Sequence, residues 1–182
     1  SSGAAWWAKV GTVMDRTALL KLLAVENFTG HWDGYSGPLQ NNHFLRSNIL
    51  GKFTMLPWGA DQTFGENRAT AALLDDYFVP LDKPSAGFPW VQQAFKKDTM
   101  PRGLLFTKCL AYKTCKVEYL KQLKAVSAKV TSAKFVASMN SAATTIAAYS
   151  PADVKAEQIR VQAWIGKQQS RVTAVLKANG VR

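Results

Sequence analysis

Two short apolar runs lie close together in the first third of the chain, with polar residues and glycines around them. The first covers residues 42–45 and the second covers residues 52–58. Both are rich in aromatic and aliphatic side chains and are bounded by Asn, Ser and Gly, which is typical of strands. Residues 47–51, which separate them, have a turn-like composition. We therefore expect an antiparallel β-hairpin with polar groups at its open end.

Beyond residue 101 the pattern becomes helical. Apolar residues recur every three or four positions in residues 104–123, and a second helix is expected over residues 132–149. Ser150-Pro151-Ala152-Asp153 predicts the start of a third helix, because Ser caps a helix, Pro suits its first turn and Asp favours its positive end. That helix should end at Asn179-Gly180. We predict an α+β, mostly helical fold with three long helices packed behind the hairpin and an ordered loop over residues 78–101.

The length and composition bound the domain organisation. The chain has 182 residues, of which 47% are hydrophobic, enough for one domain with a sizeable core. We assign residues 1–182 to that domain, with the hairpin region at 14–65 and a helical region at 101–182. No apolar run reaches the roughly 18 residues of a membrane span, and no signal peptide pattern is present. Ser1-Ser2-Gly3 resembles a cloning or truncation boundary, so an export signal would lie upstream.

The net charge of +11 is unevenly distributed. Residues 1–82 carry −2 and residues 83–182 carry +13, so the helical half is strongly basic. Such a surface attracts anions, which include an acidic protein substrate, an anionic cell-surface polymer and nucleic acid. The alternative is that these lysines only solvate helix faces. Nucleic acid is disfavoured, because the lysines spread along the helices without interleaved aromatic residues.

Residues suited to metal binding and acid–base chemistry flank the hairpin. Asp33 and Asn42 precede its first strand and Asp61 follows its second, so antiparallel pairing brings all three to one end. Their oxygens suit a hard cation such as Mg²⁺ holding phosphates, and a free carboxylate there can orient or deprotonate a hydroxyl. The alternative is that they are turn residues. His31 and His43 have no neighbouring cysteine, which argues against a zinc site.

The same residues resemble the CotH kinases, a family named after the spore coat protein H of bacilli. Residues 14–24 resemble the helix before the family's loop, and residues 101–123 resemble its helical tail, which includes the pair Cys109 and Cys115. The motifs that carry the resemblance are Trp32-Asp33, Asn41-Asn42, Gly51-Lys52-Phe53, Leu56-Pro57-Trp58 and Asp61-Gln62-Thr63-Phe64-Gly65.

The resemblance implies a protein-kinase-like carboxy-terminal lobe. It would use ATP and a divalent ion, Mg²⁺ or else Mn²⁺ or Ca²⁺, to transfer phosphate to protein side chains. By the same resemblance Asp33 is the catalytic aspartate, Asn42 or Asn41 is the metal-binding asparagine, and Asp61 is a metal-binding aspartate. The resemblance also implies a secreted or cell-surface protein of the spore coat type.

Two departures from the family pattern argue against activity. Relatives often carry an acid where this chain has Gly59, and no glycine-rich nucleotide-binding segment precedes residue 31. The alternative is a catalytically inactive kinase-like module that binds an anionic cell-surface or wall partner.

The two cysteines, Cys109 and Cys115, bear on the compartment. In one continuous helix a spacing of six residues would separate them by about 240° around the axis and about 9 Å along it, which no disulfide spans. A bridge therefore requires a helix break at residues 111–114, and Lys113 or Thr114 can start a new helix there. A bridge would indicate a location outside a reducing cytosol, whereas reduced cysteines would be buried as small apolar residues. The family resemblance favours the bridge.

Overall fold

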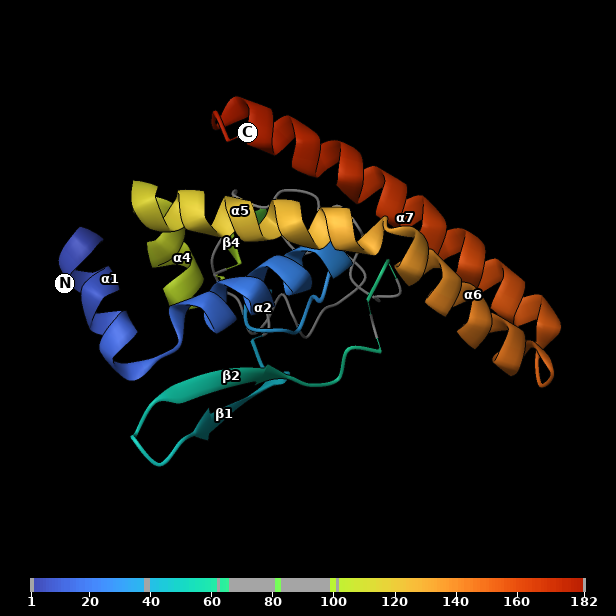
Figure 1. The fold of residues 1–182 in the computed structure, drawn as a ribbon, viewed down its shortest axis with the longest axis horizontal. Coiled ribbons are helices and arrows are strands. Elements are labelled where there is room, and N and C mark those ends of the chain that lie inside the picture. Colours follow the sequence, from blue (N-terminus) through green and yellow to red (C-terminus); the bar gives the residue numbers. More distant parts are fainter. Residues whose placement is uncertain are drawn as a thin grey trace.

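A computed structural model describes residues 2–37, 40–61, 63–65, 81–82, 99–100 and 102–181 of the chain, and the architecture below is that of these residues. Helices dominate it, and its strands form two antiparallel pairs, β1 with β2 and β3 with β4. The predicted α+β, mostly helical fold is therefore confirmed (Figure 1). The expected loop over residues 78–101 lies mostly outside the described residues. The elements in order are α1 (Gly3–Val13), α2 (Arg16–Thr29), β1 (His43–Ser47), β2 (Phe53–Pro57), β3 (Leu81–Asp82), β4 (Thr99–Met100), α4 (Leu104–Ala111), α5 (Lys113–Val130), α6 (Ala133–Ala147) and α7 (Pro151–Ala178).

The predicted hairpin is confirmed as β1 and β2. In its register His43 lies opposite Pro57 at the open end, and Ser47 lies opposite Phe53 next to the turn. The hairpin is attached to the helices along β2, because the backbone of Phe53 bridges to Met14 at the corner between α1 and α2. Met55, only 6% exposed, inserts from the middle of β2 into the helical core. The remainder of the hairpin extends away from the helices (Figure 1).

The core is centred on the contact between α2 and α5. Helix α2 starts at Asp15, whose carboxylate accepts the Ala18 N–H at 3.0 Å, and ends at Gly30, whose φ of 70° terminates the helix. Helix α5 lies along one side of α2 while the hairpin lies on the other (Figure 1). Burial of apolar side chains between the two helices provides the main driving force for folding here. Fully or almost fully buried members of this core are Leu19, Leu23, Phe28, Phe106, Tyr119, Leu120 and Leu123.

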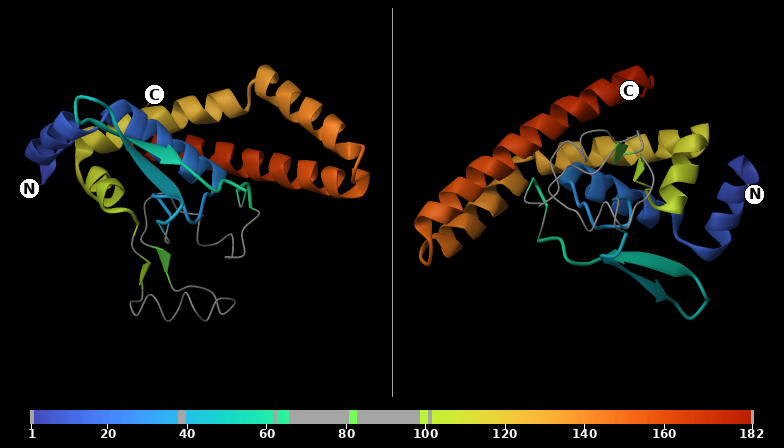
Figure 2. Two further views of the ribbon diagram at one scale, coloured as in Figure 1. Left: turned by 90° about the horizontal axis from the view of Figure 1, so that it is seen from below. Right: turned by 180° about the vertical axis from the view of Figure 1, so that it is seen from behind.

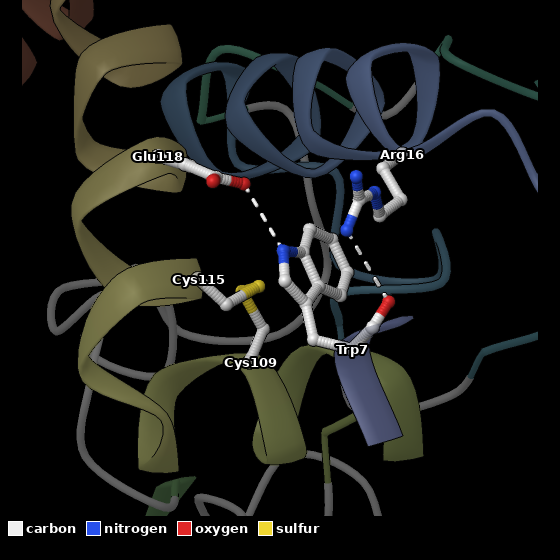
Figure 3. Close-up of a disulfide and its surroundings, with 5 residues drawn as sticks. All are labelled: Trp7, Arg16, Cys109, Cys115 and Glu118. Atoms are coloured by element: carbon white, nitrogen blue, oxygen red, sulfur yellow. Dashed lines mark hydrogen bonds between the residues drawn. A yellow bond between two sulfur atoms is a disulfide. The ribbon is translucent and has the colours of Figure 1, made fainter. Parts of the chain in front are cut away.

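The helical tail breaks where a disulfide requires it to break. Helix α4 ends at Ala111, Tyr112 is extended with φ −110° and ψ 111°, and α5 begins at Lys113. The break brings Cys109 and Cys115 to a Cα–Cα distance of 5.1 Å, and the two are joined by a disulfide, as the sequence favoured. Figure 3 shows the disulfide beside the indole of Trp7, whose Nε1–H donates to Glu118 at 3.2 Å. This hydrogen bond ties α1 to α5, which the disulfide joins to α4.

The last two helices have the predicted ends but not the predicted packing. Helix α7 runs from Pro151 to Ala178, and Asn179 caps its carboxy-terminal end. Ser150 is the N-cap residue, as predicted, but its hydroxyl bonds the Asp153 carboxylate instead of a backbone N–H. Helix α6 buries only Ala143, and it pairs with the first half of α7 in an arm that extends from the helical body (Figure 2). Among the described residues, no helix is both long and apolar enough to span a membrane.

Candidate functional site

The loop between α2 and β1 is held by a buried carboxylate, that of Glu26. The Glu26 side chain projects from the last turns of α2, and the residue is only 2% exposed. Its two oxygens accept the backbone N–H groups of Tyr35, at 3.2 Å, and Ser36, at 2.7 Å. Gly34 lies so close that a Cβ there would be 2.9 Å from the Glu26 carboxyl carbon, so the loop can wrap around this carboxylate only with glycine at that position.

Burial is the largest influence on Glu26 and raises its pKa above the ordinary 4.5, because the charged form is poorly solvated. The N–H groups of Ser36 and Tyr35 and the nearby His31 oppose this effect without cancelling it. Glu26 was not among the site residues predicted from the sequence. Its signal was a carboxylate seven residues after Leu19 and three after Leu23, on the apolar stripe of α2.

Asp33 occupies the centre of the candidate site, at the open end of the hairpin. Its Oδ2 accepts the side-chain N–H of Asn42 at 2.7 Å, and its Oδ1 lies 3.1 Å from Nδ1 of His31. Its backbone carbonyl accepts the N–H groups of Asn41 and Asn42 at 3.0 and 2.8 Å. The predicted meeting of Asp33 and Asn42 is therefore seen in the structure. With its side chain 14% exposed, Asp33 is fixed from two sides and still reachable from solvent.

His31 lies against Asp33 with its side chain almost fully buried. Its Nε2 is 3.0 Å from the carbonyl oxygen of Trp58 and its Nδ1 faces the Asp33 carboxylate, so both ring nitrogens meet acceptors. A ring nitrogen can donate to an acceptor only when it carries a proton, so two acceptors favour the imidazolium form, in which both nitrogens are protonated. Burial alone would lower the pKa of His31. The interactions with Asp33, the Trp58 carbonyl and Glu26 outweigh burial and raise that pKa above 6.5.

Gly59 follows β2 and packs against the Asn42 side chain. Its φ is +57°, a conformation that disfavours other residues, and a Cβ at this position would lie 2.4 Å from Asn42 Nδ2. The Gly59 carbonyl also lies 3.4 Å from that nitrogen. Gly59 therefore leaves the space that the Asn42 side chain occupies. An Asp or Glu in place of Gly59 would displace the Asn42 amide that donates to Asp33.

Asp61 and Asn41 are both exposed. Within the described part of the chain, Asp61 makes no hydrogen bond or ion pair with Asp33 or Asn42. Asn41 uses its backbone N–H on Asp33 and its carbonyl on His43, at 3.1 Å. No group of three or more His, Cys, Asp or Glu side chains in the described ranges is arranged to hold a metal ion. A cation here would therefore have to share its ligands with a bound molecule.

Residues from the carboxy-terminal half of the chain hold the loop between α2 and β1 and the segment after β2. Arg102 is buried and donates to the Asn27 side chain at 3.0 Å and to the Ser36 carbonyl at 3.1 Å, so it does not contribute to the basic surface expected for residues 83–182. On α7, Arg160 donates to the carbonyls of Thr63 and Phe64. The nearby Trp164 donates to the carbonyl of Phe28 at 2.8 Å. No local sequence signal marked these residues as supports of the site.

Three comparisons with known proteins bear on the identity of the chain. Neither the curated proteins nor the solved structures contain a match to this chain. The family model described as CotH kinase protein matches residues 1–176, which include every element from α1 to most of α7. That range covers the Asp33 loop, the hairpin and the disulfide-linked helices together. The chain therefore belongs to the CotH kinase protein family.

Proposed function

We propose that this chain carries the acceptor-binding and metal-binding part of a kinase site, which transfers phosphate from ATP to a protein side chain with the help of a divalent ion. The observation that supports this most directly is the setting of Asp33. Its carboxylate lies 3.1 Å from Nδ1 of His31, is aligned by the Asn42 amide and is left partly open to solvent. A carboxylate so placed can accept the hydrogen bond of an incoming hydroxyl and orient its oxygen for attack.

The neighbouring groups fit a hard cation such as Mg²⁺. Because the Asn42 Nδ2 is directed at Asp33, the amide oxygen of Asn42 is left for another partner. The exposed Asp61 on the segment after β2 adds a carboxylate. Mg²⁺ commonly takes only one or two protein ligands and completes its shell with water and substrate phosphates, so the absence of a larger cluster among the described residues suits it. When bound, the ion would neutralise phosphate charge.

An exposed aromatic pair supports a nucleotide as the bound molecule. Phe44 and Trp58 are 55% and 62% exposed, and their ring centroids are 5.4 Å apart. Phe44 lies two residues after Asn42, and Trp58 directly precedes Gly59. The Trp58 N–H donates to the Asn42 carbonyl at 3.2 Å, and this bond places the aromatic pair next to the polar cluster. Planar bases stack on such faces, which would place a nucleotide base beside the polar cluster.

The test is transfer of labelled γ-phosphate from ATP to protein acceptors, with and without Mg²⁺. We expect Asp33→Asn to lower the rate by about a thousandfold, since it removes the oriented base, and Asn42→Ala to raise the Mg²⁺ requirement. Asp153→Asn, a carboxylate on the distant arm, is the matched control and should retain the wild-type rate. Full transfer by the Asp33→Asn protein would exclude this role for Asp33.

A second function is favoured by the basic surface of α5. Four lysines of this helix are exposed, and they give it a cationic face without a described acidic neighbour on α5 other than Glu118. We therefore also propose, as the alternative, a catalytically inactive module that binds an anionic cell-surface polymer through this face. Binding that weakens steeply with salt and survives Asp33→Asn would support it, and salt-independent binding would exclude it. The four lysines are Lys113, Lys121, Lys124 and Lys129.

A further inference from the structure

The turn of the β1–β2 hairpin holds two aliphatic side chains in water. Ile49 is 101% exposed and Leu50 is 84% exposed, and they are adjacent at the point of the hairpin farthest from its open end. Figure 1 shows this turn projecting beyond the helices. A single exposed aliphatic residue is ordinary, but two at the apex of a projecting element form a small apolar tip. We define residues 49 and 50 as the hairpin tip.

Hydrogen bonds of Asn48 hold the turn on either side of the tip. The side-chain oxygen of Asn48 accepts the N–H groups of Leu50 and Lys52, each at 2.9 Å. The Asn48 N–H donates to the Lys52 carbonyl at 2.9 Å, and the Gly51 N–H donates to the Asn48 carbonyl at 3.0 Å. A segment that enters a lipid bilayer must satisfy its own polar groups, because the hydrocarbon offers no partners. The Asn48 turn meets part of that requirement, because it provides an acceptor for the Leu50 N–H within the tip.

Two cationic side chains lie next to the tip. Arg46 on β1 and Lys52 directly before β2, both exposed, flank it, and no acidic residue occurs between residues 34 and 60. Leu45 and Phe53, on the strands next to the tip, are themselves 57% and 40% exposed. An apolar apex with a basic collar matches the layering of an anionic membrane surface, where acyl chains lie beneath negatively charged headgroups.

We propose that the hairpin tip inserts into the surface of an anionic lipid bilayer, with Ile49 and Leu50 among the acyl chains and Arg46 and Lys52 at the headgroups. This inference does not depend on the proposed phosphate transfer. The paired strands between the tip and the open end span about 14 Å. A chain docked in this way would hold Asp33 and Asn42 clear of the headgroups while tethering them to the membrane.

The experiment measures binding of the intact chain to phosphatidylcholine vesicles with and without roughly 30 mol% phosphatidylglycerol. We expect binding only to the anionic vesicles. The double variant Ile49→Ser with Leu50→Ser should weaken it about tenfold or more, since it removes the apolar anchor. Arg46→Ser with Lys52→Ser should weaken it about tenfold and flatten its salt dependence. All four side chains are exposed, so thermal unfolding should confirm intact folding in each variant.

Matched controls lie on the α6–α7 arm. Tyr149→Ser removes an apolar side chain that is 89% exposed, and Lys134→Ser with Lys155→Ser removes two exposed cations. Neither change should alter vesicle binding. The proposal is overturned if the wild-type chain fails to bind anionic vesicles, or if the tip variant binds as well as the wild type. A fluorescent label attached to Ile49→Cys provides a second readout, because its emission should shift to the blue on vesicles whereas a label at Tyr149→Cys should not.

Discussion

Replacement of Gly59 by alanine tests whether this glycine is needed to seat Asn42. The substitution imposes two costs. An L-residue at φ +57° costs about 1–2 kcal/mol, and the new Cβ, 2.4 Å from Asn42 Nδ2, displaces the amide from its charged partner Asp33. Loss of a hydrogen bond to a charged group costs about 1.5–3 kcal/mol. We therefore expect the free energy of unfolding to fall by about 2.5–5 kcal/mol.

The matched control is Gly51→Ala in the hairpin turn. Gly51 has a similar φ of +73°, but a Cβ there meets no atom within 4 Å, so only the conformational cost remains. Urea unfolding of both variants should give a difference of about 1.5–3 kcal/mol between them. In an Asn42→Ala background the two glycine substitutions should cost the same, because the collision is gone. If Gly59→Ala and Gly51→Ala lower the free energy of unfolding equally in the otherwise wild-type chain, Gly59 is not needed to position Asn42.

Three further predictions concern the supports of the site. Glu26→Gln leaves one of the two loop N–H groups without an acceptor and should lower the free energy of unfolding by about 1–3 kcal/mol, measured by urea denaturation, with an unchanged stability as the contrary result. The free energy of unfolding should fall as the pH rises above 6.5 and through the raised pKa of His31, because the folded state retains a proton that the unfolded state has released. Thermal unfolding of His31→Asn at several pH values should show a weaker dependence of stability on pH. An equally steep dependence in that variant would exclude His31 as the cause. Replacing Cys109 and Cys115 together by alanine opens a loop of six residues and should cost about 2 kcal/mol in calorimetry, whereas a stability equal to that of the bridged protein would contradict the constraint.

The parts of the fold that depend on neighbouring residues could be predicted from the sequence. The hairpin follows from two apolar runs around the turn at residues 47–51, and the ends of α7 follow from Pro151 and from Asn179 before a glycine. The meeting of Asp33 and Asn42 also follows from local order, because antiparallel pairing brings the ends of one hairpin together. The disulfide needed one helix break, and the spacing of the cysteines located it.

The supports of the site could not be predicted, because they depend on contacts between distant segments. Arg102 is 75 residues from Asn27, and its sequence position among prolines and lysines resembles a surface loop. The predicted packing of α6 behind the hairpin was wrong for a related reason. Its apolar residues indicate a helix, but the sequence does not say whether their partner is the core or only α7. The roles assigned to Asp33, Asn42 and Asp61 in phosphate transfer stay predictions.

The hold of α7 on the segment after β2 has a consequence for the timing of folding. Arg160 donates to the carbonyls of Thr63 and Phe64, which are synthesised 97 and 96 residues earlier. During synthesis, the Asp33 loop and the hairpin emerge long before Arg102, which holds that loop, and before α7. The segment after Asp61 gains its contacts with Arg160 only when the first part of α7 has emerged. We therefore expect the surroundings of Asp61 to be completed late in synthesis.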